Sequence, residues 1–300
     1  MKSLDTLLAK QNLAPQELGK GRNVWYCMGY ILSVGKAEAV ALHDCDIVTY
    51  SRSLLARLVY PVANPKFNFD FCKGYYPRVS ENKVKGRVAR LLVTPLLRAL
   101  EKTIGFNEFI SFVDSFRYPL AGEFSFRRRV LKDIRIPYDW GLEIGVLSEM
   151  FRNYAGNRLC QVDIADNYDH KHQDIFFDDN SKGLSKMSID IIKVIIRKLA
   201  SQGEPFSMSI FRSLKATYYR EALDFVQIYK KDALMNAYDI DVHEEETAVE
   251  LFAKNIMVAG QVFLDSPMES PNIPTWSRVD TALPGFLNDL RKAVELDNKS

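Results

Sequence analysis

A short apolar run that ends in two carboxylates constrains this chain more than any other stretch. Residues 39–42, Ala-Val-Ala-Leu, have the length and content of a buried strand, and Asp44 and Asp46 follow almost directly. Side chains alternate along an extended segment, so both aspartates are expected to point the same way at the strand's carboxyl end. Open α/β sheets bind ligands at that edge. Two such oxygen ligands suit Mg²⁺ or Mn²⁺ shared with phosphate oxygens, although Asp-x-Asp alone is also common in turns.

The bulk composition narrows the classes of partner. The 300 residues are 47% hydrophobic and carry a net charge of +2, which fits a soluble globular protein and predicts no nucleic-acid partner. No apolar run approaches the ~18 residues of a membrane span, so no membrane partner is expected. The four cysteines are widely spread without a CxxC pair, which favours a reduced, cytoplasmic protein. Because the net charge is close to zero, any anion-binding site must come from a local group of basic residues.

Two basic segments precede predicted helices. Gly19-Lys20-Gly21 leads into an apolar helix and could bring backbone N–H groups and an ammonium to a phosphate, although a solvated turn is an equal alternative. A second helix is predicted from about 86 to 102, with Arg87 in its first turn and lysines just before it. Cations at this end oppose the helix dipole, so the arrangement favours a bound anion or else a solvated edge. Pro95 is expected to kink or break this helix.

Glu143 lies in the apolar stripe of a predicted helix. The helix begins near Asp139, its expected N-cap, and a helical projection places the glutamate among apolar side chains. The same projection puts Gly141, Gly145, Ser148, Glu149 and Arg152 on the opposite, polar face. An unpaired buried carboxylate is costly, so Glu143 needs a cation, a donor or a ligand. A site role is favoured over a structural pair with an arginine.

In the second half of the chain, a predicted strand and a histidine-containing loop are followed by predicted helices. A strand is predicted at 159–164, and the following loop holds His170 and His172 in a His-x-His pattern that could bind metal or lie at the surface. Beyond it, helical spacing is predicted at 187–199, 210–229, 247–264 and 279–296. The predicted organisation is a partial α/β domain over 1–180, which carries the candidate site residues, and a helical region over 181–300 for packing or dimerisation.

Seven motifs in order give the chain a resemblance to a known family. They are Gly19–Trp25, Ala41–Val48, Lys73–Val79, Gly86–Leu91, Arg117–Glu123, Asp139–Gly145 and Asp169–Gln173. In this order they resemble the glucosyl-3-phosphoglycerate synthases, which are retaining glycosyltransferases of the GT-A fold, related to the Rossmann fold. The resemblance covers roughly residues 19–265. It implies transfer of a hexose, with glucose favoured, from a nucleotide-diphosphate sugar to 3-phosphoglycerate, with UDP-glucose the favoured donor.

The resemblance also implies roles for residues at the donor end. Asp44 and Asp46 would hold Mg²⁺ or Mn²⁺ and meet the nucleotide, and His170 would complete the metal site. Lys20 would contact the nucleotide sugar. Glu143, together with Asp46, is predicted to be catalytic, with Glu143 orienting sugar or acceptor.

Further implied substrate contacts lie downstream. The acceptor phosphate would be held by Gly86, Arg87, Val88 and Ala89. The donor sugar would lie near Leu120, Ala121 and Gly122. His172 is predicted to bind substrate. A homodimer is implied as well.

Two other functions remain open on the sequence. Family members carry strand–helix units before the Gly-Lys-Gly loop, whereas this sequence starts just before it, so the catalytic core is expected to be N-terminally incomplete. The chain could then be a non-catalytic binding or assembly protein. Alternatively, Asp44-x-Asp46 after a strand resembles the nucleophile motif of haloacid-dehalogenase-type phosphatases, with Asp178 and Asp179 as later acids. The motifs do not distinguish the base, or glucose from mannose.

Overall fold

A four-stranded sheet forms the centre of the computed structural model, which describes residues 2–15, 18–169, 183–267 and 272–298. The strand order is β1 (Ala39–Leu42), β5 (Phe124–Arg127), β2 (Phe71–Tyr75) and β6 (Leu159–Asp163). β5 runs antiparallel to both neighbours, whereas β2 and β6 are parallel. The strands predicted at 39–42 and 159–164 are thus confirmed, and the register places Leu42 opposite Phe124. A two-stranded hairpin, β3 (Val79–Ser80) and β4 (Lys83–Val84), lies beside this sheet.

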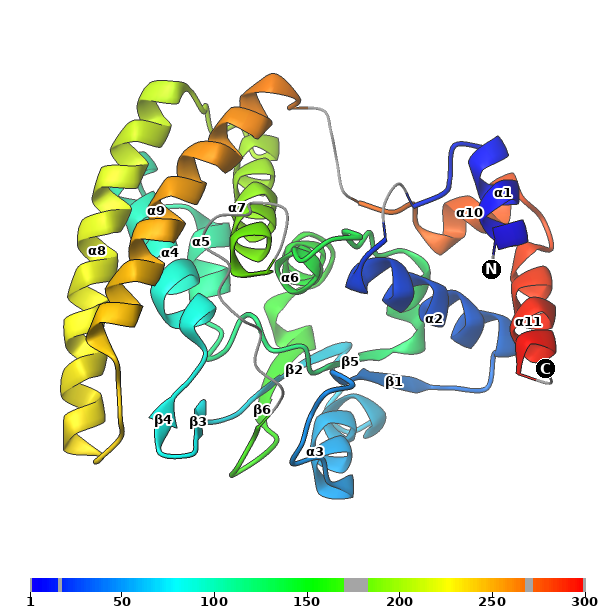
Figure 1. Ribbon diagram of the computed structural model, residues 1–300. Helices are drawn as coiled ribbons and strands as arrows, with labels where there is room; N and C mark the ends of the chain where they lie inside the picture. Colours follow the sequence, from blue (N-terminus) through cyan, green and yellow to red (C-terminus); the bar gives the residue numbers. More distant parts are fainter. Residues whose placement is uncertain (1, 16–17, 170–182, 268–271, 299–300) are drawn as a thin grey trace.

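Helices cover both faces of the sheet. α3 (Arg52–Ala63) lies on one face, and α2 (Lys20–Val34) and α6 (Leu142–Asn153) lie on the other (Figure 1). Strand alternation separates the two cores, because Phe71 packs into the larger cluster and its neighbour Cys72 into the cluster beneath α3. The expected mixed α/β core is confirmed.

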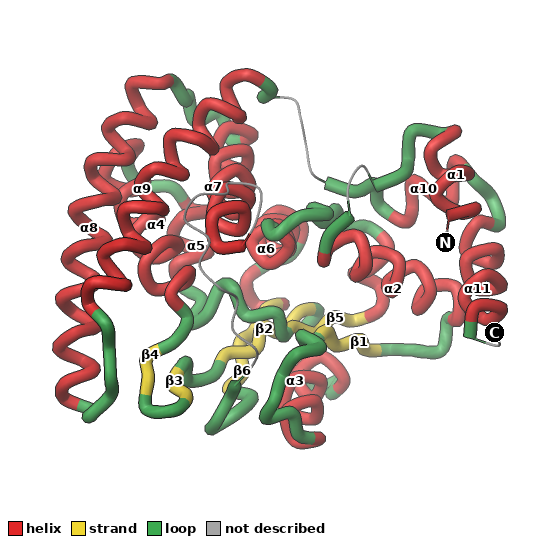
Figure 2. Tube along the Cα trace, viewed as in Figure 1, coloured by secondary structure: helices red, strands yellow, loops and turns green. Residues whose placement is uncertain are grey.

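A group of helices packs beside the sheet, at the left in Figure 2. It contains α4 (Thr94–Ile104), α5 (Glu108–Asp114), α7 (Gly183–Ser201), α8 (Met208–Met235) and α9 (Val242–Asp265). The last three confirm the helices predicted at 187–199, 210–229 and 247–264, with longer bounds. α9 is the one described helix that is long and apolar enough to cross a membrane, but it packs against α7 and α8 as a core helix does. Short helical turns are η2 (Arg128–Lys132) and η3 (Gly156–Arg158).

The helix predicted over 86–102 is continuous in the structure but not uniform. A π-helical segment, η1 (Val88–Val93), passes directly into α4, and Pro95 lies in the first turn of α4. Pro95 has no N–H to donate to the carbonyl of Leu91, four residues earlier. The hydroxyl of Tyr218 on α8 donates to that carbonyl instead, at 2.5 Å. The wide turn and this hydrogen bond replace the predicted break at Pro95.

We expect Tyr218→Phe to destabilise the chain by about 1–3 kcal/mol, because it leaves the buried Leu91 carbonyl without a donor. Tyr218 is fully buried, so water does not take over this role. Chemical denaturation followed by circular dichroism measures the change. Tyr219→Phe, at a neighbouring half-exposed position on the same helix, is the matched control and should change stability by less than about 0.5 kcal/mol. Equal stabilities for the two variants would show that the Leu91 carbonyl needs no donor.

The last helices pack against the first. α10 (Trp276–Ala282) and α11 (Phe286–Asp297) lie beside α1 (Lys2–Lys10) and α2, at the right in Figure 1. Trp276 stacks on Trp25 at 4.1 Å between ring centroids. The single helix predicted over 279–296 is wrong, because the chain breaks at Pro284 and at Gly285, whose φ is +88°. The predicted boundary at 180/181 stays a prediction.

α6 is buried from Leu142 to Met150, so the predicted polar face is wrong there and is confirmed only at the exposed Arg152 near its end. Gly145 lies against Pro137, where an added Cβ would meet the ring at 2.4 Å, and Ser148 and Glu149 are both less than 10% exposed. Glu149 is satisfied by the backbone N–H of Arg135 at 3.0 Å. The expected N-cap is also displaced: the cap residue is Gly141, and the Asp139 carboxylate accepts a hydrogen bond from its N–H. A helix surrounded by protein can carry polar groups on any face that offers partners.

Candidate functional site

A cleft of about 1270 Å³ opens where the sheet meets the group of helices around α9. Most of the predicted site residues lie on its wall, namely Lys20, Asp44, Asp46, Gly86, Arg87, Val88, Leu120, Gly122 and Glu143. Two do not: Ala89 lines a smaller adjoining hollow, and Ala121 is fully buried. His170 and His172, like Asp178 and Asp179, lie outside the described residues. The structure therefore brings together most of the constellation read from separate motifs.

Lys20 forms ion pairs with two carboxylates of the cleft, those of Asp44 and Glu143. Its Nζ lies 2.5 Å from Oδ1 of Asp44 and 2.8 Å from Oε1 of Glu143. Burial alone would lower the pKa of Lys20, but the charges of Glu143 and Asp44 outweigh it and raise the pKa above its usual value. Lys20 is therefore a permanent cation, and it is the partner that the apolar setting of Glu143 required.

Close backbone packing fixes the position of Asp44. Gly122 lies directly against its carboxylate, and an added Cβ there would come within 2.4 Å of Oδ2. Glu123, the next residue, is fully buried and accepts hydrogen bonds from the hydroxyls of Tyr76 and Tyr168, at 2.8 and 2.7 Å. The backbone N–H of Asp44 also donates to Glu123, at 3.4 Å. The glycine thus leaves room for the aspartate, and the glutamate holds its backbone.

A buried lysine supports the same loop from below. Lys73 on β2 is fully buried and donates to the carbonyl of Ala121 at 2.6 Å. Burial lowers its pKa to about 8, and the charges of Glu143 and Glu123 limit the fall. Ala121, predicted as a substrate contact, therefore has its carbonyl turned to Lys73, and its neighbours Leu120 and Gly122 face the cleft.

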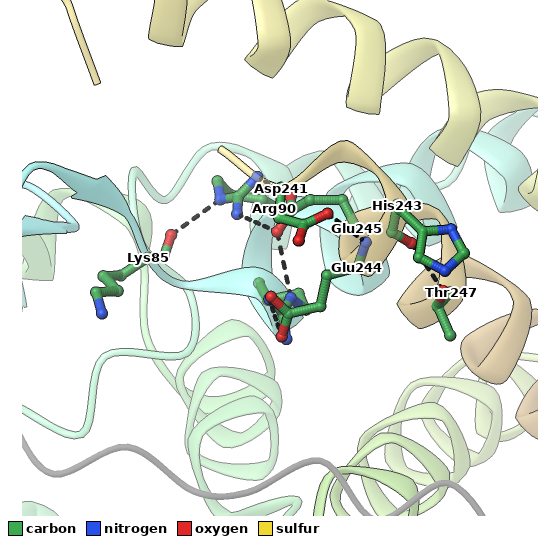
Figure 3. Close-up of polar contacts among 8 residues, drawn as sticks. Lys85, Arg90, Asp241, His243, Glu244, Glu245 and Thr247 are labelled. Atoms are coloured by element: carbon green, nitrogen blue, oxygen red, sulfur yellow. Dashed lines mark hydrogen bonds and ion pairs between the residues drawn. The ribbon is translucent and has the colours of Figure 1, made fainter. Parts of the chain in front are cut away.

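Acidic residues of α9 hold the arginines at the other end of the cleft. Glu245 is 3% exposed and accepts hydrogen bonds from Arg90 at 2.8 and 3.1 Å and from Nε of Arg87 at 3.2 Å. Arg90 also donates to the carbonyl of Lys85 at 2.9 Å (Figure 3). Glu244, about half exposed, contacts Nη2 of Arg87 at 2.9 Å. Arg87, which the sequence analysis placed at a possible anion site, is thus anchored to α9 together with Arg90.

The donor set at Asp44 and Asp46 suits a divalent cation. Both carboxylates line the cleft from the loop that follows β1, and hard oxygen ligands are what Mg²⁺ and Mn²⁺ prefer. Lys20 contacts Asp44 through a single carboxylate oxygen, so the other oxygen is available. Among the described residues no group of three His, Cys, Asp or Glu side chains forms a complete metal site. The third ligand expected from the resemblance, His170, lies outside them.

Several residues of the cleft were not predicted from the sequence. Glu123, which is buried behind the cleft wall, directly precedes the apolar strand β5, and an acid in that position could have been noticed in the sequence. Arg78 lines the cleft between β2 and β3, and its motif had been noted without a role. Glu244 and Glu245 begin a long helix, where acidic residues are common for capping reasons. Their role depends on a contact across more than 150 residues of chain, which no local pattern reveals.

We expect Asp139→Asn to stabilise the protein at pH 8 by about 1–2 kcal/mol and to have little effect at pH 4.5. Burial and the charge of Asp190 raise the pKa of Asp139 from 3.8 to about 6. Between these values the folded chain binds more protons than the unfolded chain, so stability falls as the pH rises and the loss is complete above pH 6. Asparagine keeps an acceptor for Gly141 without the charge. Urea denaturation at both pH values tests this, and an equal gain at both would contradict it.

Sequence comparison gives the chain close relatives, although no family profile matches it. The glucosyl-3-phosphoglycerate synthase of Persephonella marina is 48% identical over 280 residues, which are 93% of this chain and 69% of that protein. The enzyme of the same name from Methanococcoides burtonii is 38% identical over 284 residues, again 69% of its length. The relatives are therefore longer than the part that this chain matches.

Structure comparison gives neighbours of the same name. A crystal structure of glucosyl-3-phosphoglycerate synthase from Mycobacterium tuberculosis with Mn²⁺, UDP-glucose and phosphoglyceric acid is 23% identical, with a TM-score of 0.47, and the match covers 65% of this chain and 58% of that one. The identity to the Persephonella protein, over more than two thirds of its length, decides the assignment. The chain belongs to the glucosyl-3-phosphoglycerate synthase family.

Proposed function

We propose that this chain transfers glucose from UDP-glucose to the hydroxyl of 3-phosphoglycerate, with retention of anomeric configuration. The relatives that carry this name cover nearly the whole chain, and related structures hold Mn²⁺, UDP-glucose and phosphoglyceric acid together. The observation that carries the proposal is the bridge from Lys20 to Asp44 and Glu143 in the same cleft as Arg87. The Lys20 ammonium, the two carboxylates and the arginine proposed to bind the acceptor thus line the same cleft.

Lys20 supplies fixed positive charge where the leaving group develops negative charge. Cleavage of the sugar–phosphate bond transfers an electron pair to the departing diphosphate, and a preorganised ammonium stabilises that charge. Asp44 and Asp46 are the described residues that would hold a divalent cation, which when bound supplies further electrostatic stabilisation of the diphosphate. Gly122 leaves the space that the Asp44 carboxylate occupies, and Glu123 holds the Asp44 backbone.

Glu143 and Arg87 orient the two substrates. Glu143 holds Lys20 and can accept a hydrogen bond from a sugar hydroxyl with its second carboxylate oxygen. Arg87, with Gly86 beside it, offers a guanidinium to the acceptor phosphate, which fixes the acceptor hydroxyl near the anomeric carbon. Among the described cleft carboxylates, Glu143 and Asp44 are bound to Lys20, which disfavours a free protein nucleophile there. This supports a same-face displacement in which the diphosphate helps to deprotonate the acceptor.

The transfer is tested directly with the purified chain, UDP-glucose, 3-phosphoglycerate and Mn²⁺ or Mg²⁺. The proposal predicts a glucosylated product of the expected mass by mass spectrometry, and loss of product when 3-phosphoglycerate is left out or EDTA is added. Release of inorganic phosphate from 3-phosphoglycerate without a sugar donor would instead favour the phosphatase alternative. Binding of UDP and 3-phosphoglycerate without turnover would favour the non-catalytic one.

We also propose a cytoplasmic homodimer. The wide spacing of the four cysteines supports a reducing compartment, and the dimer is carried over from what the resemblance implies. Sedimentation at several protein concentrations distinguishes monomer from dimer.

A further inference from the structure

Arg78 differs from Arg87 in having no counter-ion among the residues that the structure describes. Arg87 is neutralised by Glu244 and Glu245. Arg78 lines the same cleft, yet within the described parts of the chain its side chain makes neither an ion pair nor a hydrogen bond, and its Nε is buried without a partner. A guanidinium with a buried, unsatisfied donor is costly unless something else binds it.

Three aromatic rings hold Arg78 in place without using its N–H groups. The guanidinium carbon lies 5.5 Å from the ring centroid of Tyr118, 5.8 Å from that of Tyr76 and 6.0 Å from that of Tyr168. Tyr76 and Tyr168 are themselves stacked at 3.5 Å, which makes this aromatic wall rigid. Contact with ring faces supports a planar cation and leaves its edge, which carries the donors, for a ligand.

Arg78 also lies directly beside the segment that is proposed to bind the acceptor. A Cβ added at Gly86 would come within 3.2–3.4 Å of the Arg78 side chain, and the Arg78 carbonyl accepts a hydrogen bond from Lys85 at 2.7 Å. Gly86 has a φ of +75°, so a side chain there would be strained as well as crowded. The two arginines therefore flank one glycine, and each offers a separate cation to one small ligand.

We propose that Arg78 binds the carboxylate of the acceptor, while Arg87 binds its phosphate. This inference rests on the proposed function, in which the acceptor is a three-carbon acid with an anion at each end. A planar guanidinium matches a carboxylate through two parallel hydrogen bonds, so Arg78 makes the site select phosphorylated acids over phosphorylated alcohols. The tyrosine wall orients the guanidinium, and binding of the carboxylate satisfies its unpaired donors.

The test compares ligands that lack one anion each. Isothermal titration of the full chain measures the affinity for 3-phosphoglycerate, for glycerol 3-phosphate, which has no carboxylate, and for glycerate, which has no phosphate. We expect Arg78→Gln to weaken 3-phosphoglycerate and glycerate by about 10- to 100-fold and to leave glycerol 3-phosphate within twofold of the wild type. Arg78→Lys keeps the charge but not the planar fork, so its affinity for 3-phosphoglycerate should lie between those of the wild type and Arg78→Gln. Arg98→Gln, at an exposed pair with Asp114, is the matched control and should change none of the three affinities.

Each outcome decides the inference. An equal loss for glycerol 3-phosphate would assign Arg78 to the phosphate and overturn it, and so would unchanged affinities or a wild-type chain that binds none of the three ligands. Under turnover, Arg78→Gln should raise the KM for 3-phosphoglycerate by the same factor and leave the KM for UDP-glucose unchanged. A wild-type chain that binds 3-phosphoglycerate through Arg78 but transfers no glucose would refute the proposed function and leave this inference standing.

Discussion

Replacement of Lys20 by methionine is expected to lower kcat/KM for glucosyl transfer by about 100- to 1,000-fold, because it removes a preorganised cation from the leaving group. The substitution keeps the apolar stem of the side chain but leaves Asp44 and Glu143 facing one another without a counter-ion. Lys20 is about one quarter exposed, so the cost in stability should be about 2–3 kcal/mol, below the range for fully buried pairs. Steady-state kinetics and urea denaturation measure the two effects separately.

A double variant separates structure from catalysis at this position. Lys20→Met combined with Glu143→Gln removes one of the two carboxylates and should recover at least half of the lost stability. Activity should not recover with it, since the cation is still missing. If stability and activity returned together, Lys20 would be a structural residue only, and the leaving-group role would be wrong.

Replacement of Glu245 by alanine is expected to destabilise the chain by about 3–5 kcal/mol, because it leaves the buried guanidinium of Arg90 uncompensated. Arg87 would lose its Nε partner at the same time, so the KM for 3-phosphoglycerate should rise about tenfold while that for UDP-glucose stays the same. Thermal unfolding and a KM series for each substrate check both parts. A variant of wild-type stability would mean that Arg90 finds another partner.

Glu244→Gln is the matched comparison on the same helix turn. Glu244 is about half exposed, and exposed ion pairs contribute little, so its loss should change stability by less than about 1 kcal/mol. Glu244 competes with an acceptor anion for Arg87, so the KM for 3-phosphoglycerate should fall rather than rise. A lower KM for 3-phosphoglycerate in Glu244→Gln and a higher one in Glu245→Ala would show that Glu244 competes with the acceptor and that Glu245 positions Arg87.

Residues next to one another in the sequence were enough to predict the strand and the helix that carry Asp44, Asp46 and Lys20. The strand before Asp44 and Asp46 and the start of α2 at Lys20 follow from apolar runs and turn residues that lie next to them in the sequence. The burial of Glu143 followed from helical periodicity, and its need for a cation followed from the cost of burying a charge. The sequence did not identify the cation. Lys20 lies 123 residues away, and only the packing of α2 beside α6 brings the two together.

The errors came from tertiary context that periodicity does not contain. Pro95 was expected to break a helix, but a hydroxyl from α8 satisfies the carbonyl that proline leaves free. Glu149 of α6 was placed on the polar face, but it is buried and the backbone N–H of Arg135 satisfies it. Conversely, Pro284 and Gly285 do end a helix, and their effect was underestimated because the apolar spacing continues across them. Arg78 and Glu245 carry no local pattern, because their meaning depends on what lies across the cleft.

We propose that Asp44 and Asp46 would hold a divalent cation where the diphosphate binds beside Lys20. Isothermal titration of UDP into the chain tests this with Mn²⁺ present, with EDTA present, and with the Asp46→Asn variant in Mn²⁺. We expect binding to the wild type in Mn²⁺ and at least a tenfold loss of affinity in each of the other two experiments. UDP affinity that is the same in EDTA as in Mn²⁺, or unchanged by Asp46→Asn, would contradict it.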